Sequence, residues 1–160
     1  MTEPRWLTAE ERRAWLAVLS LTTRLPAQLD SALQRAAKIT LFDYHVLAML
    51  SEAEGRVLPM SRLAERTNSS LSRLSHVVKK LQERGWVKRG SSAEDARVTV
   101  VKLLPPGMEL LVRVAPEHVE SVRHELFDGL DEQDTADLAR IGRKIVAHTE
   151  PTHWIFQDEA

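Results

Sequence analysis

The apolar pattern of the chain changes its period abruptly near the middle. Between Leu71 and Arg84 apolar residues recur three and four positions apart, which predicts an amphipathic helix, and Gly85 stands where helices commonly end. The runs WVKRG (86–90) and RVTVVKLL (97–104) are strand-like, and the small, polar and charged residues between them are typical of a turn. This segment therefore predicts a helix that runs directly into a two-stranded hairpin.

Helical spacing also dominates the rest of the sequence. Residues 8–36 open with Thr8 and Glu11, a capping-box signature, and Pro26 within this run predicts a kink or a restart. A short extended piece is expected at 56–58. The other predicted helices cover residues 40–55, 60–67, 107–128 and 131–149. In the last two, we expect the apolar positions to point inward.

Two short helices separated by the polar break TNSS (67–70) and followed by a hairpin occur in the order of a winged helix-turn-helix. A length of 160 residues indicates one compact unit. The predicted fold is therefore mainly α with a small β-hairpin wing, in which a winged helix-turn-helix core is flanked by N- and C-terminal helices.

The net charge of −1 hides an uneven distribution. Residues 56–102 contain eleven Lys and Arg against four Asp and Glu, a net charge of +7, so the remaining residues carry −8. A basic middle between acidic ends favours contact with a polyanion. A solvated charged surface is the alternative interpretation of the same run.

The second helix of the motif has a polar face suited to DNA. Its apolar stripe accounts for one side, which leaves seven side chains expected to look outward: Ser70, Ser72, Arg73, Ser75, His76, Lys79 and Lys80. In a helix-turn-helix this helix enters the major groove, where Arg can bridge guanine, hydroxyls fit near base edges and Lys neutralises phosphate. We therefore predict that these residues contact double-stranded DNA.

The hairpin turn carries Asp95 two residues before Arg97. An arginine held at the tip of a wing could reach the minor groove beside the helix, and Asp95 would orient its guanidinium by charge-assisted hydrogen bonds. A plain surface ion pair in a turn is the alternative.

The segment from Met60 to Gly107 resembles the DNA-binding core of the multiple antibiotic resistance regulator (MarR) family. In that family the helix ends in L-x-x-(K/R)-G-(W/L)-(V/I)-x-R, the wing contains D-x-R, and the following strand ends in K-L-T-x-x-G. The matching residues here are Leu81, Arg84, Gly85, Trp86, Val87, Arg89, Asp95, Arg97, Lys102, Leu103 and Gly107. The order of helices before and after this core agrees as well.

The resemblance implies that Arg97 enters the minor groove, with Asp95 as its partner, and that the chain is a DNA-binding transcription regulator, expected to be a repressor. Two positions depart from the family pattern. His76 stands where relatives often have Arg, so contact there is expected to be weaker and pH-dependent. Leu104 replaces the usual Thr, which removes a helix cap.

The terminal helices each carry one apolar stripe that a lone domain of this size would bury poorly. Relatives pair such helices into a two-fold homodimer that reads a pseudo-palindromic operator. The expected divisions are therefore an N-terminal dimerisation helix (1–36), a DNA-binding domain (37–104), and C-terminal dimerisation helices with a tail (105–160). Trp154, Ile155 and Phe156 in that tail suit a clasp onto the other subunit, or alternatively packing on the tail's own chain.

Family members often bind small phenolic or aromatic acids between the dimer helices and the DNA-binding lobe, which lowers DNA affinity. Such an effector site is predicted at Trp15, His45, Met49 and Arg113. The alternative is that these side chains belong to the core.

Other classes of protein find little support in the sequence. None of the six histidines forms a recognised metal motif, so no metal or other cofactor is expected, although a metal-responsive regulator is an alternative. No nucleophile elbow, P-loop or dinucleotide turn points to an enzyme. The polar N-terminus and the lack of a long apolar run predict a cytoplasmic protein without a membrane anchor. The main rival is a winged-helix module that binds proteins and no DNA, but such a module has no need of Arg97 beside a basic core.

Overall fold

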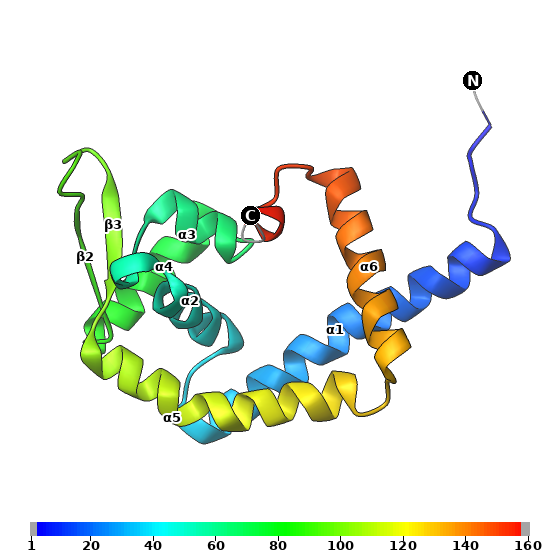
Figure 1. The fold of residues 1–160 in the computed structure, drawn as a ribbon, viewed down its shortest axis with the longest axis horizontal. Coiled ribbons are helices and arrows are strands. Elements are labelled where there is room, and N and C mark those ends of the chain that lie inside the picture. The colour runs from blue at the N-terminus through cyan, green and yellow to red at the C-terminus, as the bar shows by residue number, and fades with distance from the viewer. Residues whose placement is uncertain (1–2, 158–160) are drawn as a thin grey trace.

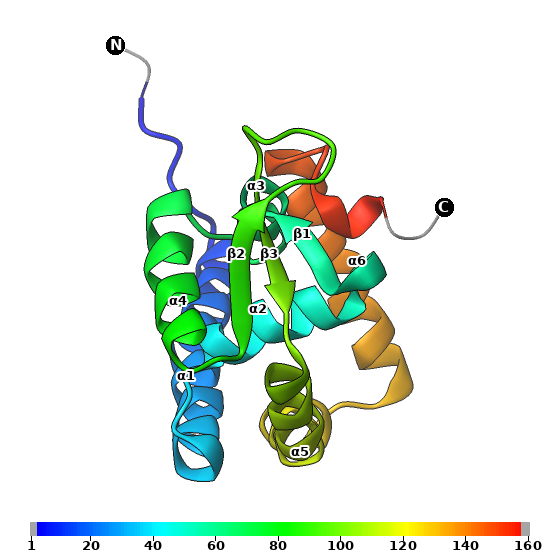
Figure 2. The same ribbon diagram turned by 90° about the vertical axis from the view of Figure 1, so that its left-hand side faces the viewer.

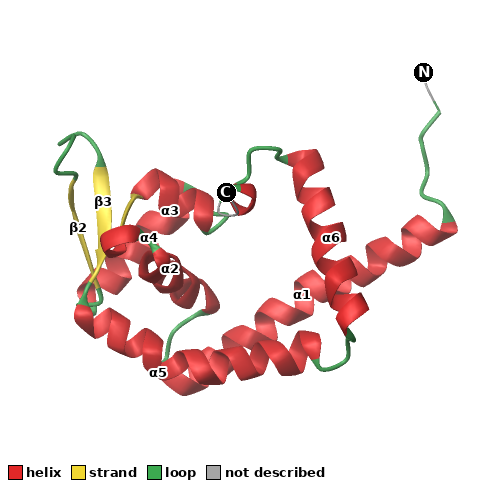
Figure 3. Cartoon of the chain, viewed as in Figure 1, coloured by secondary structure: helices red, strands yellow, loops and turns green. Residues whose placement is uncertain are grey.

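The predicted winged-helix architecture is present in the computed structural model, which describes residues 3–157 (Figures 1 and 3). In chain order the elements are α1 (Ala9–Ala37), α2 (Leu41–Glu52), a 3-10 turn (Glu54–Arg56), β1 (Val57–Pro59), α3 (Met60–Arg66), α4 (Leu71–Glu83), β2 (Val87–Ser91), β3 (Thr99–Leu103), α5 (Pro105–Val122), a π-helical turn (Arg123–Phe127), α6 (Glu132–Thr149) and a 3-10 turn (Trp154–Phe156). The chain is thus mainly helical, and its small sheet forms the wing.

Local hydrogen bonds explain where the long helices begin. The predicted capping box of α1 is present, because the Thr8 hydroxyl accepts from the Glu11 N–H while the Glu11 carboxylate accepts from the Thr8 N–H. Pro26 lies inside α1, and the helix continues through it without the predicted restart. Helix α5 begins at Pro105, two residues before the predicted start, since proline is well suited to the first turn. Its N-cap, Leu104, makes no side-chain capping bond, as the missing Thr predicted.

The sheet has one strand more than the predicted hairpin. Strands β2 and β3 pair antiparallel as expected, with Val87 opposite Leu103, and β1 pairs antiparallel with the other edge of β3, giving the order β1-β3-β2. The extended piece was predicted near this position, but its pairing was not. A strand of three residues has too few positions to show an alternating pattern.

The hydrophobic core lies between α2, α3, α4, the sheet and the first half of α5. Its fully buried side chains include Leu47, Leu50, Leu63, Leu74 and Leu81. The second half of α1 joins this core through Leu33. Among the described residues, no helix is long and apolar enough to cross a membrane.

Several apolar side chains that were predicted to point inward are exposed. Leu138, Ile141 and Ile145 of α6 are 38%, 46% and 56% exposed, and no described residue of α6 is buried. Val119 on α5 is exposed as well, and so are Trp15 and Leu19 on α1, for which no inward direction was predicted. The prediction is wrong for a single chain because these helices leave the core: Figure 1 shows α6 and the first half of α1 extending away from it.

Burial affects the protonation of two histidines. Burial lowers the pKa of His45 and of His118, and the His118 ring lies against Tyr44 with 4.1 Å between ring centroids. Protonation is therefore easier in the unfolded chain, so the resulting stability is full above the unfolded pKa of about 6.5 and is lost as pH falls from there through the lower pKa of the folded state.

We expect the melting temperature to fall between pH 7.5 and pH 5.5, measured by differential scanning calorimetry. The double variant His45→Gln/His118→Gln should have a flatter profile, because the groups that take up protons on unfolding are gone. His148→Gln, which alters an exposed histidine, is the control. An equally steep profile in the double variant would contradict this explanation.

Gly107 lies in the first turn of α5, where this helix packs against Trp86 in the turn between α4 and β2. A Cβ at this position would collide with the Trp86 carbonyl oxygen, which already accepts a hydrogen bond from Leu104 N–H at 2.9 Å, and would lie 2.8 Å from Leu103 Cδ1. We expect Gly107→Ala to lower the free energy of unfolding by about 1–3 kcal/mol through overpacking. Chemical denaturation measures this loss. Gly129→Ala is the control, because its Cβ would meet no atom within 4 Å, and an equal loss in both variants would count against the clash.

Candidate nucleic-acid interface

Helix α4 presents one polar face beside the wing. The Ser70 hydroxyl caps the helix by accepting from the Arg73 N–H at 3.2 Å, and Leu74, Val78 and Leu81 fix its inner side in the core. Figure 2 shows α4 running alongside β2, with the hairpin loop projecting beyond the sheet. Helix α4 and strand β2 of the wing thus lie side by side.

Most of the side chains predicted on this face are exposed: Ser70, Ser72, Arg73, His76 and Lys79. Ser75 is half-buried at the edge of the face. Arg73 is exposed but turns sideways, and its guanidinium lies 4.1 Å from the centre of the Phe42 ring of α2. The exposed groups are hydroxyls, an imidazole and cations, which are suited to base edges and phosphates.

Lys80 was predicted to look outward with the other six side chains, but it is half-buried. Its side chain turns inward, where the ammonium donates to the Asp43 carboxylate at 2.6 Å. Asp43 is only 1% exposed and caps α2 by accepting from the Thr40 N–H at 2.9 Å. A buried carboxylate requires a partner, so Lys80 compensates the charge of Asp43, while its own side chain remains 40% exposed. Its contact with phosphate stays a prediction.

The predicted pairing in the wing is present. Arg97 donates from Nε to Asp95 Oδ1 and from Nη2 to Asp95 Oδ2, both at 3.1 Å, and its backbone N–H donates to Oδ1 at 2.9 Å. The hydrogen bonds from the Arg97 side chain hold the pKa of the Asp95 carboxyl below its ordinary value. The Arg97 side chain is nevertheless 91% exposed. A guanidinium with a fixed direction therefore projects from the tip of the hairpin.

One exposed side chain of α4 was not among the predicted contacts. Leu71, in the first turn, is 55% exposed. Its spacing from Leu74 and Val78 places it on the apolar stripe, so periodicity gave no signal that it would be exposed.

The four residues predicted to bind an effector do not come together. Met49 is buried in the core and Trp15 lies on the exposed first half of α1. Arg113 lines a pocket on α5, whereas His45 lines a different one. Within a single chain these four residues therefore do not form one site, and the effector site stays a prediction.

His45 belongs to a pocket of about 650 Å³ between α1, α2 and α4. Its walls combine Pro26, Leu41 and the Phe42 ring with the cations Arg73 and Lys80. Since Arg73 and Lys80 come from α4, a molecule bound here would touch the helix that carries the polar face.

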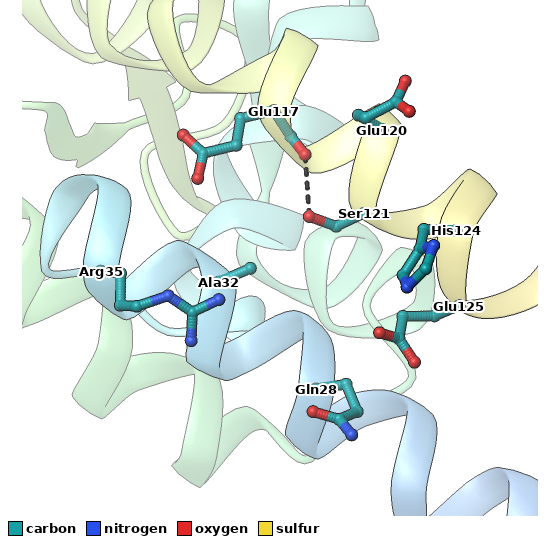
Figure 4. Close-up of a pocket in the computed structure, with 8 residues that line it drawn as sticks. All are labelled: Gln28, Ala32, Arg35, Glu117, Glu120, Ser121, His124 and Glu125. Carbon is teal, nitrogen blue, oxygen red and sulfur yellow. Dashed lines mark hydrogen bonds between the residues drawn. The ribbon is translucent and has the colours of Figure 1, made fainter.

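A second pocket, of about 410 Å³, lies between α1 and α5 (Figure 4). Its lining includes Glu117, Glu120, Glu125, His124 and Arg35, and Ser121 donates to the Glu117 carbonyl at 2.9 Å. Within residues 3–157, no group of three or more His, Cys, Asp or Glu side chains could hold a metal ion. The α5 residues of this acidic pocket lie near the C-terminal end of that helix, whereas β3 of the wing precedes its N-terminal end.

Comparisons with known proteins agree with this geometry. Residues 38–98 match the family model described as MarR family. The chain is 38% identical to Sco3205, a MarR family transcriptional regulator from Streptomyces coelicolor whose structure contains DNA, with a TM-score of 0.89 over 95% of each chain. AbsC, from the same organism, is 36% identical with a TM-score of 0.87, over 93% of this chain and 100% of AbsC.

A curated relative, the transcriptional repressor MprA of Escherichia coli, is 27% identical over 104 residues. That match includes 65% of this chain and spans 58% of the length of MprA. These relatives are transcription regulators and not enzymes, as the sequence predicted. The fold, the paired arginine of the wing and the 38% identity lead to one assignment: the chain belongs to the MarR family of winged helix-turn-helix, DNA-binding transcription regulators.

Proposed function

We propose that this chain acts as a homodimer that binds a pseudo-palindromic double-stranded operator and represses transcription from it. The observation that supports this most strongly is that two neighbouring elements both expose suitable groups: α4 exposes Ser72, His76 and Lys79, and the wing exposes the guanidinium of Arg97, which Asp95 directs. The helix would read the major groove, and Arg97 would enter the adjacent minor groove. Sco3205, which shares this fold, is described in complex with DNA.

The apolar stripes outside the core support the homodimer. Trp15 and Leu19 on α1, and Ile141 and Ile145 on α6, are too large and too numerous to be left in water. A two-fold axis would cover them with the same residues of a second chain. Residues 1–36 and 105–160 would then form the dimer, and residues 37–104 the DNA-binding domain. Because its target is the chromosome, the proposal places the protein in the cytoplasm.

An effector would bind in the pocket between α1, α2 and α4. The Phe42 ring and Leu41 suit an aromatic ring, and Arg73 suits an acidic group on it. Such a ligand would compete with the Arg73–Phe42 contact and shift α4, which would lower operator affinity. A panel of phenolic acids added to preformed operator complexes tests this step.

Fluorescence anisotropy tests the proposed function directly. The purified protein is titrated against labelled DNA from upstream of its own coding region, with random DNA as competitor, at two salt concentrations. We expect competitor-resistant binding by two chains per site. Affinity should fall linearly with salt on a log-log plot, with a slope of about −0.9 per neutralised phosphate.

Two results would change the assignment of the target. Binding no tighter than to random DNA would move the operator to another part of the genome, and selection from a random DNA pool would then find it. Absence of DNA binding even at low salt would overturn the proposal and favour the protein-binding module, whose apolar interface would respond little to salt.

A further inference from the structure

The segment that follows α6 packs against the helix-turn-helix of the same chain. Residues Glu150–Gln157, which we call the C-terminal strap, leave the end of α6 and pack against α3 and the turn that precedes α4. His153 is only 9% exposed, and Trp154 packs against the hydrophobic core. Of the two arrangements considered for this tail, the structure has the one in which it packs on its own chain.

His153 is the residue that joins the strap to the turn. Its Nε2 lies 2.7 Å from Asn68 Oδ1, and its Nδ1 accepts a hydrogen bond from the Ile155 N–H at 3.3 Å. Since Nδ1 acts as an acceptor, the proton of the neutral ring lies on Nε2, and Nε2 donates to Asn68. One imidazole ring therefore connects the 3-10 turn of the strap to the α3–α4 turn.

Asn68 lies at a position where the backbone direction changes. It has a positive φ of 49°, and its neighbour Ser69 donates its N–H to Ala64 at 3.0 Å to close the turn. Two residues later Ser70 caps α4. A force on the Asn68 side chain would therefore be applied next to the first turn of the helix that carries the polar face.

Further contacts hold the strap at both ends. Arg143 of α6 donates to the Ile155 carbonyl at 3.4 Å and lies 5.0 Å from the centre of the Phe156 ring. Arg62 of α3 donates to Gln157 Oε1 at 3.4 Å. The strap is thus bonded to α6 on one side and to α3 on the other.

The rest of α6 makes little contact with the core. None of its described residues is buried, and Leu138, Ile141 and Ile145 are exposed. The strap is therefore a main physical link between α6 and the DNA-binding domain within this chain. A movement of α6 would therefore be passed through the strap to the α3–α4 turn.

We propose that the C-terminal strap sets the orientation of α4 relative to α6, with His153 and Asn68 as positioning residues. The inference rests on the proposed function, because α6 of each chain would be fixed in the dimer and the two straps would then define the separation of the two α4 helices. A pseudo-palindrome is read only when that separation matches the half-site spacing, about one turn of DNA. The strap would thus select operators by spacing.

The test combines two readouts on the full-length chain. Hydrogen exchange of the free protein measures how tightly residues 67–74 are held, and needs no DNA. Anisotropy with operators of native spacing, and with one base pair inserted or removed, measures spacing preference. The variants are His153→Ala, His153→Gln, which keeps a side-chain N–H donor, and His148→Ala, an exposed histidine of α6, as control.

We expect His153→Ala to exchange faster across residues 67–74 and to bind the native operator about tenfold more weakly. It should also discriminate less between native and altered spacings, while His153→Gln loses less than about threefold and His148→Ala matches the wild type. Circular dichroism should show the same helix content in all of them.

Two outcomes would overturn the inference. Unchanged exchange in His153→Ala would mean that the strap does not hold the turn. Faster exchange with an equal loss of affinity at every spacing would mean that the strap only stabilises the fold. If the wild type bound no operator at all, the proposed function would fail, and hydrogen exchange alone would still decide whether the strap holds the turn.

Discussion

Replacing Ile141 by Glu is expected to separate the dimer and remove most operator affinity. Ile141 lies in the middle of the α6 stripe and is 46% exposed in the single chain. A carboxylate there would be transferred from water to an apolar interface without a partner, at a cost of several kcal/mol. The protein should therefore elute as a monomer in size-exclusion chromatography with light scattering.

Operator binding is lost in Ile141→Glu because a monomer can contact only one of the two half-sites. One chain holds one half-site, and without the linked second chain the apparent affinity should fall by about 10²- to 10⁴-fold. Ala136→Glu is the matched control, because this exposed position lies on the opposite side of α6 from Ile141. If Ile141→Glu remained dimeric with full affinity, the interface would have to lie on another surface.

Arg97→Ala is expected to weaken operator binding while leaving the dimer intact. The side chain is 91% exposed and donates two hydrogen bonds to Asp95, so its removal disturbs no core contact. We expect a loss of about 1–3 kcal/mol of binding free energy, or roughly fivefold to more than a hundredfold in affinity. Anisotropy against the native operator measures the loss.

Two further variants separate the contact made by Arg97 from its charge. Arg12→Ala removes one positive charge from exposed α1, far from the wing, and should change affinity little. Asp95→Asn leaves the arginine but weakens the bonds that direct it, so an intermediate loss is expected. Operator affinity that is unchanged in Arg97→Ala would remove the wing from the mechanism.

The sequence predicted those parts of the molecule whose signals are local. The capping box at Thr8, the helix end at Gly85 and the Asp95–Arg97 pair each depend on residues a few positions apart, and all three are present. Gly85, with a φ of 73°, has the left-handed backbone that favours glycine after a helix. Such features need no knowledge of the tertiary fold.

The features that were missed depend on residues distant in the chain. Lys80 meets Asp43 across 37 positions, and His153 meets Asn68 across 85, so no spacing rule could connect them. Apolar periodicity correctly predicted that α5 and α6 are helices with an apolar stripe. Periodicity shows that a face needs covering, but it cannot tell whether the chain's own core or a second molecule covers it.

The exposed stripes of α1 and α6 have a consequence for gene dosage. In the proposed dimer, folding and association are linked, so the melting temperature should rise with protein concentration. At low abundance the concentration of dimer falls as the square of the concentration of chains. A twofold drop in synthesis would then lower the concentration of dimer by up to about fourfold. The promoters that it controls would therefore respond more steeply than in proportion to its expression.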